Sequence, residues 1–216
     1  MDNESEVDAL ASSAGRLGLR PDAATAGRLL AFERELLAWN RRINLVSRAT
    51  AAEARERHIL DSLAPLPELE GAHHLLDIGS GGGLPGIPLK IARPDLEVTL
   101  VESIGKKAAF LEHVSARLGL GPGLQVRRVR AEGNPARERL PVVDAVISRA
   151  VADLPSWLLL AVRYVKPSGR VLAMLARFDE SALQRAAASA GVRLAGVRRY
   201  SLPDSGAPRA VARFER

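Results

Sequence analysis

The chain of 216 residues contains no cysteine. This absence excludes disulfide bonds, metal sites built on thiolates and cysteine nucleophiles. It also excludes two classes of enzyme: those that attack a pyrimidine ring with a thiolate, and those that hold an iron–sulfur cluster on cysteines. The chemistry of this protein must therefore rely on other side chains or on the backbone.

Aromatic residues and long hydrophobic runs are also scarce. Aromatic side chains make up 4% of the chain, with two Trp, two Tyr and four Phe, which argues against a platform that stacks single-stranded bases. No run approaches the ~18 consecutive apolar residues of a membrane span. The first residues, 1–8, are acidic and have no apolar stretch typical of a secretory signal. We therefore expect a cytoplasmic protein that does not associate with membranes.

The charge that is present is unevenly distributed. The net charge is +6, and 47% of the residues are hydrophobic, enough to build a core. Residues 1–70 carry 12 acidic and 9 basic side chains, whereas residues 71–216 carry 13 acidic and 22 basic ones. A basic excess of this kind attracts a polyanion and suits a nucleic-acid substrate.

The most informative segment is 75–89, which reads Leu-Leu-Asp-Ile-Gly-Ser-Gly-Gly-Gly-Leu-Pro-Gly-Ile-Pro-Leu. An apolar strand runs directly into a glycine-rich turn and then into the start of a helix. The glycines let a ligand approach bare backbone, and the helix start offers unpaired N–H groups to an anion. Gly81, Gly83 and Gly86 fit the G-x-G-x-x-G pattern, which is compatible with a dinucleotide, S-adenosylmethionine (SAM) or a tight turn without a ligand.

Two acidic residues favour SAM. Asp77 precedes Gly79 by two positions, inside a strand where a dinucleotide-binding protein usually has only apolar side chains, and an acid there suits the ammonium group of SAM. Glu102 ends the next expected strand, where a carboxylate can accept two hydrogen bonds from a ribose. We interpret these residues as a SAM site, with the glycine backbone near the methionine part. The alternative is a tight turn with incidental surface acids.

The remaining pattern predicts an α/β fold. We expect residues 1–70 to form an N-terminal helical extension, in which 39–47 is a structured connection, and residues 71–216 to form a SAM-dependent methyltransferase domain. Strands and helices alternate in the second part, which predicts a doubly wound, mostly parallel, seven-stranded sheet. The last two strands have only a turn between them, so they are expected to form the antiparallel hairpin typical of methyltransferases. The expected helices are 22–39, 51–62, 86–92, 104–119, 154–165 and 179–190, and the expected strands are 75–79, 96–102, 124–129, 143–148, 170–175, 192–200 and 209–214.

Residues that follow the strands are the natural ligand contacts of such a sheet. Ala131 and Glu132 follow the third strand, where an acid can accept the exocyclic amine of adenine; the alternative is an acid that favours a helix start. Arg149 follows the fourth strand, and we interpret it as a group that positions the substrate or cofactor by binding an anion, either the methionine carboxylate or a substrate phosphate. The alternative is an ordinary surface arginine. The Asp/Asn-Pro-Pro-aromatic motif of enzymes that methylate base amines is absent here, which disfavours that reaction.

The histidines give weaker signals. His58 lies between arginines in a predicted helix, and we interpret it as a surface residue, with a general base or a phosphate contact as alternatives. His73 and His74 precede a strand, lack the spacing of metal ligands and are expected to be loop residues. We expect no metal site.

Several motifs together resemble the RsmG family, also called glucose-inhibited division protein B. The resemblance covers about residues 30–155. It is carried by Trp39-Asn40 with Asn44-Leu45, by Arg57-His58-Ile59-Leu60-Asp61-Ser62, by the glycine segment 77–89, and by Ile147-Ser148-Arg149-Ala150.

This family comprises bacterial enzymes that use SAM to methylate N7 of a guanine in 16S ribosomal RNA. The resemblance implies that the SAM contacts fall on Gly79, Leu84, Ala131, Glu132 and Arg149, with Glu102 at the usual ribose position. It also implies 16S rRNA or the small ribosomal subunit as the partner, and we expect a monomer. One departure is that many members have Leu-Lys-Gly after the fifth strand, where this chain has Leu175-Ala176-Arg177. A substrate role for that lysine is therefore in doubt here.

This reaction fits the lack of an acid–base constellation. Guanine N7 has a free lone pair and no proton, so in-line attack on a methyl group needs alignment and no general base. Holding two reactants in attacking distance supplies up to about 7–11 kcal/mol in the best intramolecular cases. Two alternatives remain open: a nicotinamide-dependent oxidoreductase, and a catalytically silent SAM-binding partner of RNA.

Overall fold

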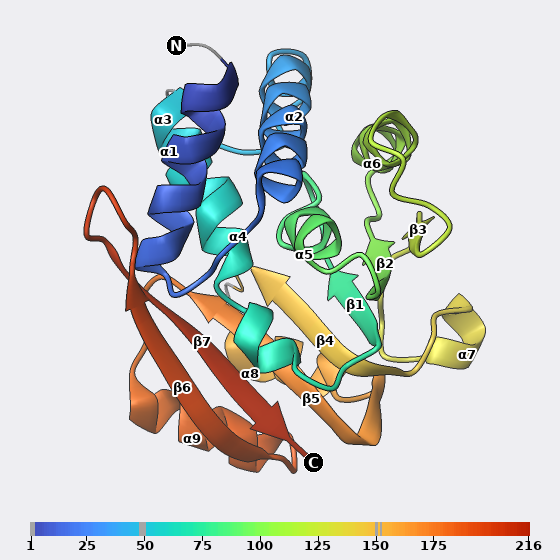
Figure 1. Cartoon of the computed structure of the whole chain (residues 1–216). Coiled ribbons are helices and arrows are strands. Elements are labelled where there is room, and N and C mark those ends of the chain that lie inside the picture. The colour runs from blue at the N-terminus through green and yellow to red at the C-terminus, as the bar shows by residue number, and fades with distance from the viewer. Residues whose placement is uncertain (1–2, 48–50, 150, 152) are drawn as a thin grey trace.

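The computed structural model describes residues 3–47, 51–149, 151 and 153–216. Its centre is a seven-stranded sheet with the order β3-β2-β1-β4-β5-β7-β6 (Figure 1). The first five strands run parallel, and β7 pairs antiparallel with both β5 and β6. The predicted sheet and its closing hairpin are confirmed. The strands are β1 (His74–Ile78), β2 (Glu97–Val101), β3 (Leu124–Arg127), β4 (Val143–Arg149), β5 (Val165–Leu175), β6 (Arg193–Ser201) and β7 (Pro208–Glu215).

The inner strands are apolar because both faces of the sheet are covered. Successive side chains of a strand point to opposite faces, so Leu75 enters one hydrophobic cluster and Leu76 the other. In β4, Ile147 and Val146 divide in the same way. Both clusters consist of buried hydrophobic side chains, and the sheet therefore forms a well-packed support for the loops at the ends of its strands.

Helices cover the two faces unequally (Figure 1). One face packs against the N-terminal helices and the helices that follow β1 and β2: α1 (Asn3–Arg16), α2 (Ala23–Asn40), α4 (Asp61–Leu63), α5 (Gly86–Ala92) and α6 (Gly105–Arg117). The other face packs against α8 (Leu154–Ala161) and α9 (Glu180–Ser189). The short α7 (Pro135–Glu138) follows β3. Because one continuous cluster joins the N-terminal helices to the sheet, these helices help to form the core. No helix in the described part of the chain is long and apolar enough to cross a membrane.

The N-terminal extension differs from the prediction in two ways. Helix α1 was not predicted as a separate element, although its Leu10 is completely buried. The helix expected over 51–62 is interrupted: α3 (Ala51–Ala54) leads into the π-helix Arg55–Leu60, which continues into α4. The predicted connection after α2 is confirmed, because the side-chain oxygen of Asn40 accepts hydrogen bonds from the backbone N–H groups of Leu45 and Val46 at 2.8 and 3.0 Å.

The boundary between α8 and β5 also differs. The sequence predicts a helix over 154–165 and a strand over 170–175, but α8 ends at Ala161 and β5 begins at Val165. The chain turns sharply between them, where the N–H of Tyr164 donates to the carbonyl of Ala161 at 3.0 Å. A register shift in β4 accommodates the residues at 166–169, which include a proline and a glycine, at the beginning of β5.

Candidate functional site

The residues predicted to bind a ligand lie at one edge of the sheet. Asp77 is in β1, Glu102 follows β2, Ala131 and Glu132 follow β3, and Arg149 ends β4. These four strands are neighbours and run parallel, so their carboxyl ends face the same side. In open α/β sheets this edge, where the strand order reverses beside β1, is the usual ligand site.

The glycine-rich turn has the backbone that only glycine adopts readily. Gly79, Gly81 and Gly83 have φ angles of 79°, 55° and 79°, in the left-handed region that disfavours side chains. A Cβ atom at Gly79 would meet no atom within 4 Å, whereas one at Gly83 would lie 2.4 Å from Cδ1 of Ile87. Gly79 therefore exposes bare backbone, while Gly83 is needed for packing. Leu84 is buried in the cluster beneath the turn.

Asp77 is the most perturbed carboxyl group in this region. Its side chain is completely buried, and its Oδ2 accepts the N–H of Gly86 at 3.0 Å, at the start of α5. Its Oδ1 has no hydrogen-bond partner among the described residues. Burial raises the pKa of Asp77 from 3.8 to about 7, against the opposing effects of the Gly86 hydrogen bond and the charge of Arg149. The side chain thus supports the turn and retains one unsatisfied acceptor.

Glu102 ties the turn to the end of β2. Its carboxylate is buried, with Oε2 accepting the N–H of Gly81 at 3.0 Å and Oε1 accepting the N–H of Ile104 at 2.7 Å. These contacts place an acid at the tip of β2, where a ribose-binding group was predicted, and they hold the acid in position without help from other side chains.

The loop after β3 is fixed by a hydrogen-bond network rather than by the other candidate residues. Glu138 accepts hydrogen bonds from the N–H groups of Glu132 and Asn134 at 3.0 and 2.9 Å, and it also accepts one from the hydroxyl of Tyr164. Ala131 is half-buried against the second cluster, and Glu132 is exposed. Among the described residues, no hydrogen bond or ion pair joins Ala131 or Glu132 to Asp77, Glu102 or Arg149, so the structure does not bring this loop into direct contact with those three residues.

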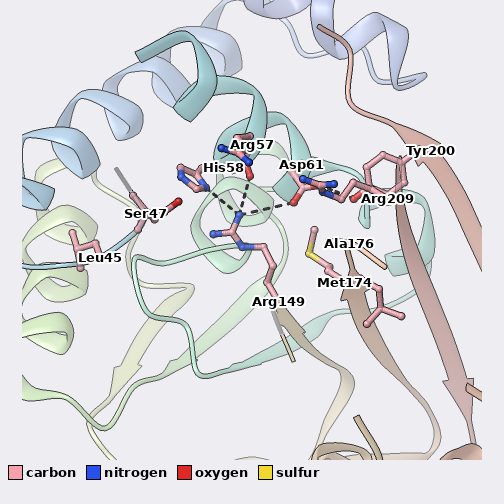
Figure 2. A pocket seen from close by; sticks show the side chains of 12 residues that line it. Leu45, Ser47, Arg57, His58, Asp61, Arg149, Met174, Ala176, Tyr200 and Arg209 are labelled. Atoms are coloured by element: carbon pink, nitrogen blue, oxygen red, sulfur yellow. Dashed lines mark hydrogen bonds and ion pairs between the residues drawn. The ribbon is translucent and has the colours of Figure 1, made fainter. Parts of the chain in front are cut away.

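Arg149 is bound to the N-terminal extension. Figure 2 shows its guanidinium pointing toward the π-helix Arg55–Leu60 and α4. Its Nη1 donates to the carbonyl of Arg57 at 3.0 Å, lies 3.3 Å from Nδ1 of His58, and lies 3.9 Å from Oδ2 of Asp61. Burial lowers the pKa of Arg149, and the charge of Asp61 partly compensates. Arg149 is therefore a half-buried cation that Arg57, His58 and Asp61 contact. It is not the ordinary surface arginine that the sequence left open as an alternative.

The interpretation of His58 as a surface residue is wrong. Only 6% of His58 is exposed, because the π-helix turns this side chain inward against Arg149. Burial, reinforced by the charge of Arg149, lowers the pKa of His58 to about 4. The imidazole is thus neutral at physiological pH. His74 also differs from the expected loop position, since it begins β1 and its Nε2 lies 3.1 Å from Oγ1 of Thr99.

Asp61 forms the centre of a second set of contacts. The hydroxyl of Tyr200 donates to its Oδ1 at 2.7 Å, and Nε of Arg209 lies 3.8 Å from the same oxygen. Burial raises the pKa of Asp61, while the Tyr200 hydrogen bond and the charges of Arg149 and Arg209 lower it. These contacts join α4, β4, β6 and β7, which are far apart in the sequence.

A pocket of about 280 Å³ opens beside this cluster (Figure 2). It lies where β4 and β5 end, beneath the π-helix and next to the hairpin. Its lining is cationic, with three arginines and a single carboxylate among the residues that form it. Ala176, where the chain departs from the pattern of the family that it resembles, also lines the pocket. The lining residues are Leu45, Val46, Ser47, Arg57, His58, Asp61, Arg149, Met174, Leu175, Ala176, Tyr200 and Arg209.

Comparisons with known proteins agree with this geometry. The family model described as GidB, rRNA small subunit methyltransferase G, matches residues 26–210. A protein of Anaeromyxobacter dehalogenans (strain 2CP-C), named ribosomal RNA small subunit methyltransferase G, is 50% identical over 97% of each chain. A protein of the same name from Myxococcus xanthus (strain DK1622) is 47% identical over 99% of each chain. The chain belongs to this family.

The fold agrees with that assignment. A SAM-dependent methyltransferase from Aquifex aeolicus has a TM-score of 0.57 at 17% identity, covering 75% of this chain and 92% of its own. This member of the rRNA small subunit methyltransferase G family is therefore a SAM-dependent methyltransferase whose substrate is ribosomal RNA. The nicotinamide-dependent alternative is not favoured. Among the residues that the structure describes, no group of three or more His, Asp or Glu side chains could hold a metal ion.

The sequence reasoning missed the surroundings of Arg149. The segment from Arg57 to Ser62 carries part of the family resemblance, but its sequence pattern indicates no role for Asp61. Tyr200 and Arg209 were not considered, because they lie in the hairpin far along the chain. The available signal was an acid, Asp61, within an otherwise apolar stretch, since such acids are rarely buried without partners.

Proposed function

We propose that this protein transfers a methyl group from SAM to N7 of a guanine in 16S rRNA. The observation that carries this proposal is a cationic pocket lined by Arg149, at the end of β4, which pairs in parallel with β1, the strand that leads into a glycine turn of the SAM-binding type. We further propose that one chain acts as a monomer, because every element of the site comes from the same chain. It would act in the cytoplasm, where bacterial ribosomal RNA is found.

The residues at the ends of β1 and β2 fit SAM. The unsatisfied Oδ1 of Asp77 is a buried acceptor that suits an ammonium group, and the open space over Gly79 leaves room for a ligand against the backbone. In the proposed site, the backbone of Gly79, Gly81 and Gly83 and the carboxylate of Asp77 hold the methionine part. When bound, SAM supplies an electrophilic methyl group.

The remaining proposed contacts complete the site. Glu102 holds the ribose from the tip of β2, and the loop containing Ala131 and Glu132 holds the adenine. The family resemblance also places Leu84 and Arg149 among the contacts. Of these residues, Arg149 is the one that also lines the pocket, and its charge favours an anionic group there.

The pocket suits the nucleotide that accepts the methyl group. A base that undergoes chemistry leaves its stack and enters such a pocket. Arg57, Arg149 and Arg209 provide positive charge for the RNA phosphate backbone attached to that base. His58 and Asp61 already bind Arg149 and Tyr200, so neither is free to act as a base. Guanine N7 needs no base, and the role of the pocket is to align the lone pair with the methyl group.

The proposal is tested by methyl transfer to small ribosomal subunits that lack the modification. Labelled SAM and the purified protein are incubated with these subunits, with naked 16S rRNA and with large subunits as a control, and the nucleosides are then separated by mass spectrometry. We expect 7-methylguanosine at a single position in the small-subunit RNA. Another methylated atom would overturn the assignment of N7. Binding of SAM without any methyl transfer would favour the catalytically silent RNA partner.

A further inference from the structure

The π-helix Arg55–Leu60 presents the carbonyl of Arg57 to Arg149 without competition from the N–H of Asp61. In an α-helix the N–H of Asp61 would bond to the carbonyl of Arg57, four residues earlier. Here it bonds to the carbonyl of Glu56, five residues earlier. The carbonyl of Arg57 is therefore not occupied by Asp61 and instead accepts Nη1 of Arg149 at 3.0 Å. π-Helical turns often occur at functional sites.

The second acceptor is the imidazole of His58. A guanidinium only donates hydrogen bonds, so Nδ1 of His58, 3.3 Å from Nη1 of Arg149, must hold a lone pair. The proton of the neutral ring is then on Nε2. This nitrogen is buried and has no hydrogen-bond partner among the described residues. A buried N–H without a partner destabilises the fold, so the contact between Nδ1 and Arg149 is retained at a cost.

Together these contacts fix one nitrogen of Arg149 and leave the others available. Arg57, His58 and Asp61 all approach Nη1 (Figure 2). Within the described part of the chain, Nη2 and Nε have no hydrogen-bond or ion-pair partner given by the structure. The guanidinium is also near enough to Asp77 to affect the pKa of that carboxyl group. Arg149 is thus held through one nitrogen, and its other two nitrogens are left to donate to a ligand in the pocket that Arg149 lines.

We propose that His58 is a positioning residue: its neutral imidazole, presented by the π-helix, fixes Arg149 so that the remaining N–H groups of the guanidinium bind an anionic oxygen of a ligand. This inference rests on the proposed function, in which the anion is either the carboxylate of SAM or a phosphate of the RNA. The N-terminal extension thereby contributes to the methyl-transfer site through Arg149.

The test compares His58→Asn with His58→Leu. Asparagine and leucine have nearly the same shape, but only asparagine places an acceptor oxygen close to the position of Nδ1. We expect His58→Leu to reduce kcat/KM for methyl transfer roughly tenfold or more, as expected for the loss of a hydrogen bond to a charged group, and His58→Asn to recover most of that loss. His113→Leu on α6, outside this site, serves as a control and should behave like the unchanged protein.

Two further measurements identify the anion. If it is the carboxylate of SAM, His58→Leu weakens SAM binding in calorimetry without RNA. If it is an RNA phosphate, the Kd of SAM is unchanged and KM for the small subunit rises. In an Arg149→Ala background, replacing His58 by leucine should have no further effect on either quantity, because the positioned group is missing.

Three outcomes would overturn the inference. The first is equal activity of His58→Leu and the unchanged protein. The second is an equal loss of kcat/KM in the leucine and asparagine variants with unchanged thermal stability. The third is a loss of kcat/KM from His58→Leu that adds to the loss from Arg149→Ala. Failure of the proposed function is distinguishable from these results. If the unchanged protein transfers no methyl group to guanine, the proposed function fails, while the affinities of the same variants for SAM and for the small subunit, measured by binding alone, still decide the role of His58.

Discussion

At the scale of single residues, two opposing effects act on the ionisation of the Asp77 carboxyl group. It receives the N–H of Gly86 and so supports the start of α5, which favours the ionised carboxylate. Complete burial favours the protonated form and is the stronger effect, because the pKa rises to about 7. A cationic ligand near the unsatisfied Oδ1 would reverse this balance. The energetic cost of ionising Asp77 is therefore coupled to ligand binding.

This coupling predicts how stability changes with pH. The folded-state pKa of Asp77 lies above its unfolded value of 3.8, so the folded chain binds an extra proton. Its stabilisation is present below pH 3.8 and is lost as the pH rises through about 7. Between pH 5.5 and 8 the ligand-free protein should lose on the order of 2 kcal/mol relative to Asp77→Asn, or roughly 4–8 °C in Tm.

The measurement is a thermal melt of both proteins across this range, without and with SAM. His58 acts in the opposite direction below pH 6.5, because its folded-state pKa is lowered to about 4. Asp77→Asn contains the same histidine, so the difference between the two proteins isolates Asp77. A difference in Tm that stays constant from pH 5.5 to 8 would contradict the perturbed carboxyl group.

A second prediction concerns Gly79. A side chain at this position meets no protein atom within 4 Å, but the φ of 79° is unfavourable for aspartate. Gly79→Asp should therefore cost only about 1–3 kcal/mol of stability and should reduce SAM affinity by at least 100-fold, because the new side chain occupies the ligand space. Isothermal titration with SAM measures the loss.

Gly119→Asp is the matched control for this change. Gly119 follows α6 on the opposite edge of the sheet, has a φ of 59°, and also offers open space to a Cβ atom. The two variants should show similar losses in Tm, and the Gly119 variant should bind SAM normally. Similar SAM affinities in both variants would mean that the ligand does not lie over Gly79.

At the scale of elements, an ion pair joins α2 to the π-helix. Glu33 is 3% exposed, and its carboxylate accepts a hydrogen bond from Nε of Arg55 at 2.8 Å. Nη2 of Arg55 also lies 3.5 Å from Oε1 of Glu6 in α1. Burial raises the pKa of Glu33, and Arg55 opposes this effect. One arginine thus links three segments of the N-terminal extension.

Removing this arginine should destabilise the whole extension. Arg55→Ala leaves the carboxylate of Glu33 buried without its partner, which typically costs about 3–5 kcal/mol. Denaturant unfolding should show this loss, and the double variant Arg55→Ala/Glu33→Leu should recover much of it because no buried charge remains. A single-variant loss below about 1 kcal/mol would show that water replaces Arg55 as the partner of Glu33.

The sequence was most informative where a local pattern alone decides the structure. The strand and turn over 75–83 and the closing hairpin follow from apolar runs, glycines and a turn sequence, and they were predicted correctly. The π-helix was not predictable, because no local pattern in 51–62 marks it and the hydrogen bond that its Arg57 carbonyl accepts comes from the distant Arg149. The early start of β5 likewise depends on a register shift in the neighbouring β4.

The residues of the candidate site also divide into those that a local sequence pattern predicts and those that distant contacts place. Arg149 was found because it follows a strand in a sheet whose topology was already predicted. His58 was misplaced because flanking arginines suggest a solvated surface, while its burial results from packing of the π-helix against β4. The contacts of Asp61 with Tyr200 and Arg209 join elements more than a hundred residues apart. No local sequence pattern encodes such contacts.

At the scale of the whole molecule, the two proposed ligands, RNA and SAM, differ in how strongly their binding depends on charge. The basic excess of residues 71–216 lies in the part that contains the sheet and two of the three arginines of the pocket, Arg149 and Arg209. RNA is a dense polyanion, so each phosphate that the protein neutralises releases counterions, and binding weakens as salt increases. SAM carries few charges, and the proposed site for it is partly buried, where salt screens less.

The two affinities should therefore respond differently to salt. If the basic surface neutralises about four phosphates, log K for rRNA should fall with log salt at a slope of about −3, so that raising KCl from about 50 to 200 mM weakens binding more than tenfold. The Kd of SAM should change less than about twofold over the same range. Filter binding with 16S rRNA and calorimetry with SAM measure the two responses on one preparation. Equal salt responses for the two ligands would show that the basic surface does not contact the RNA backbone, and recognition would then depend on the pocket alone.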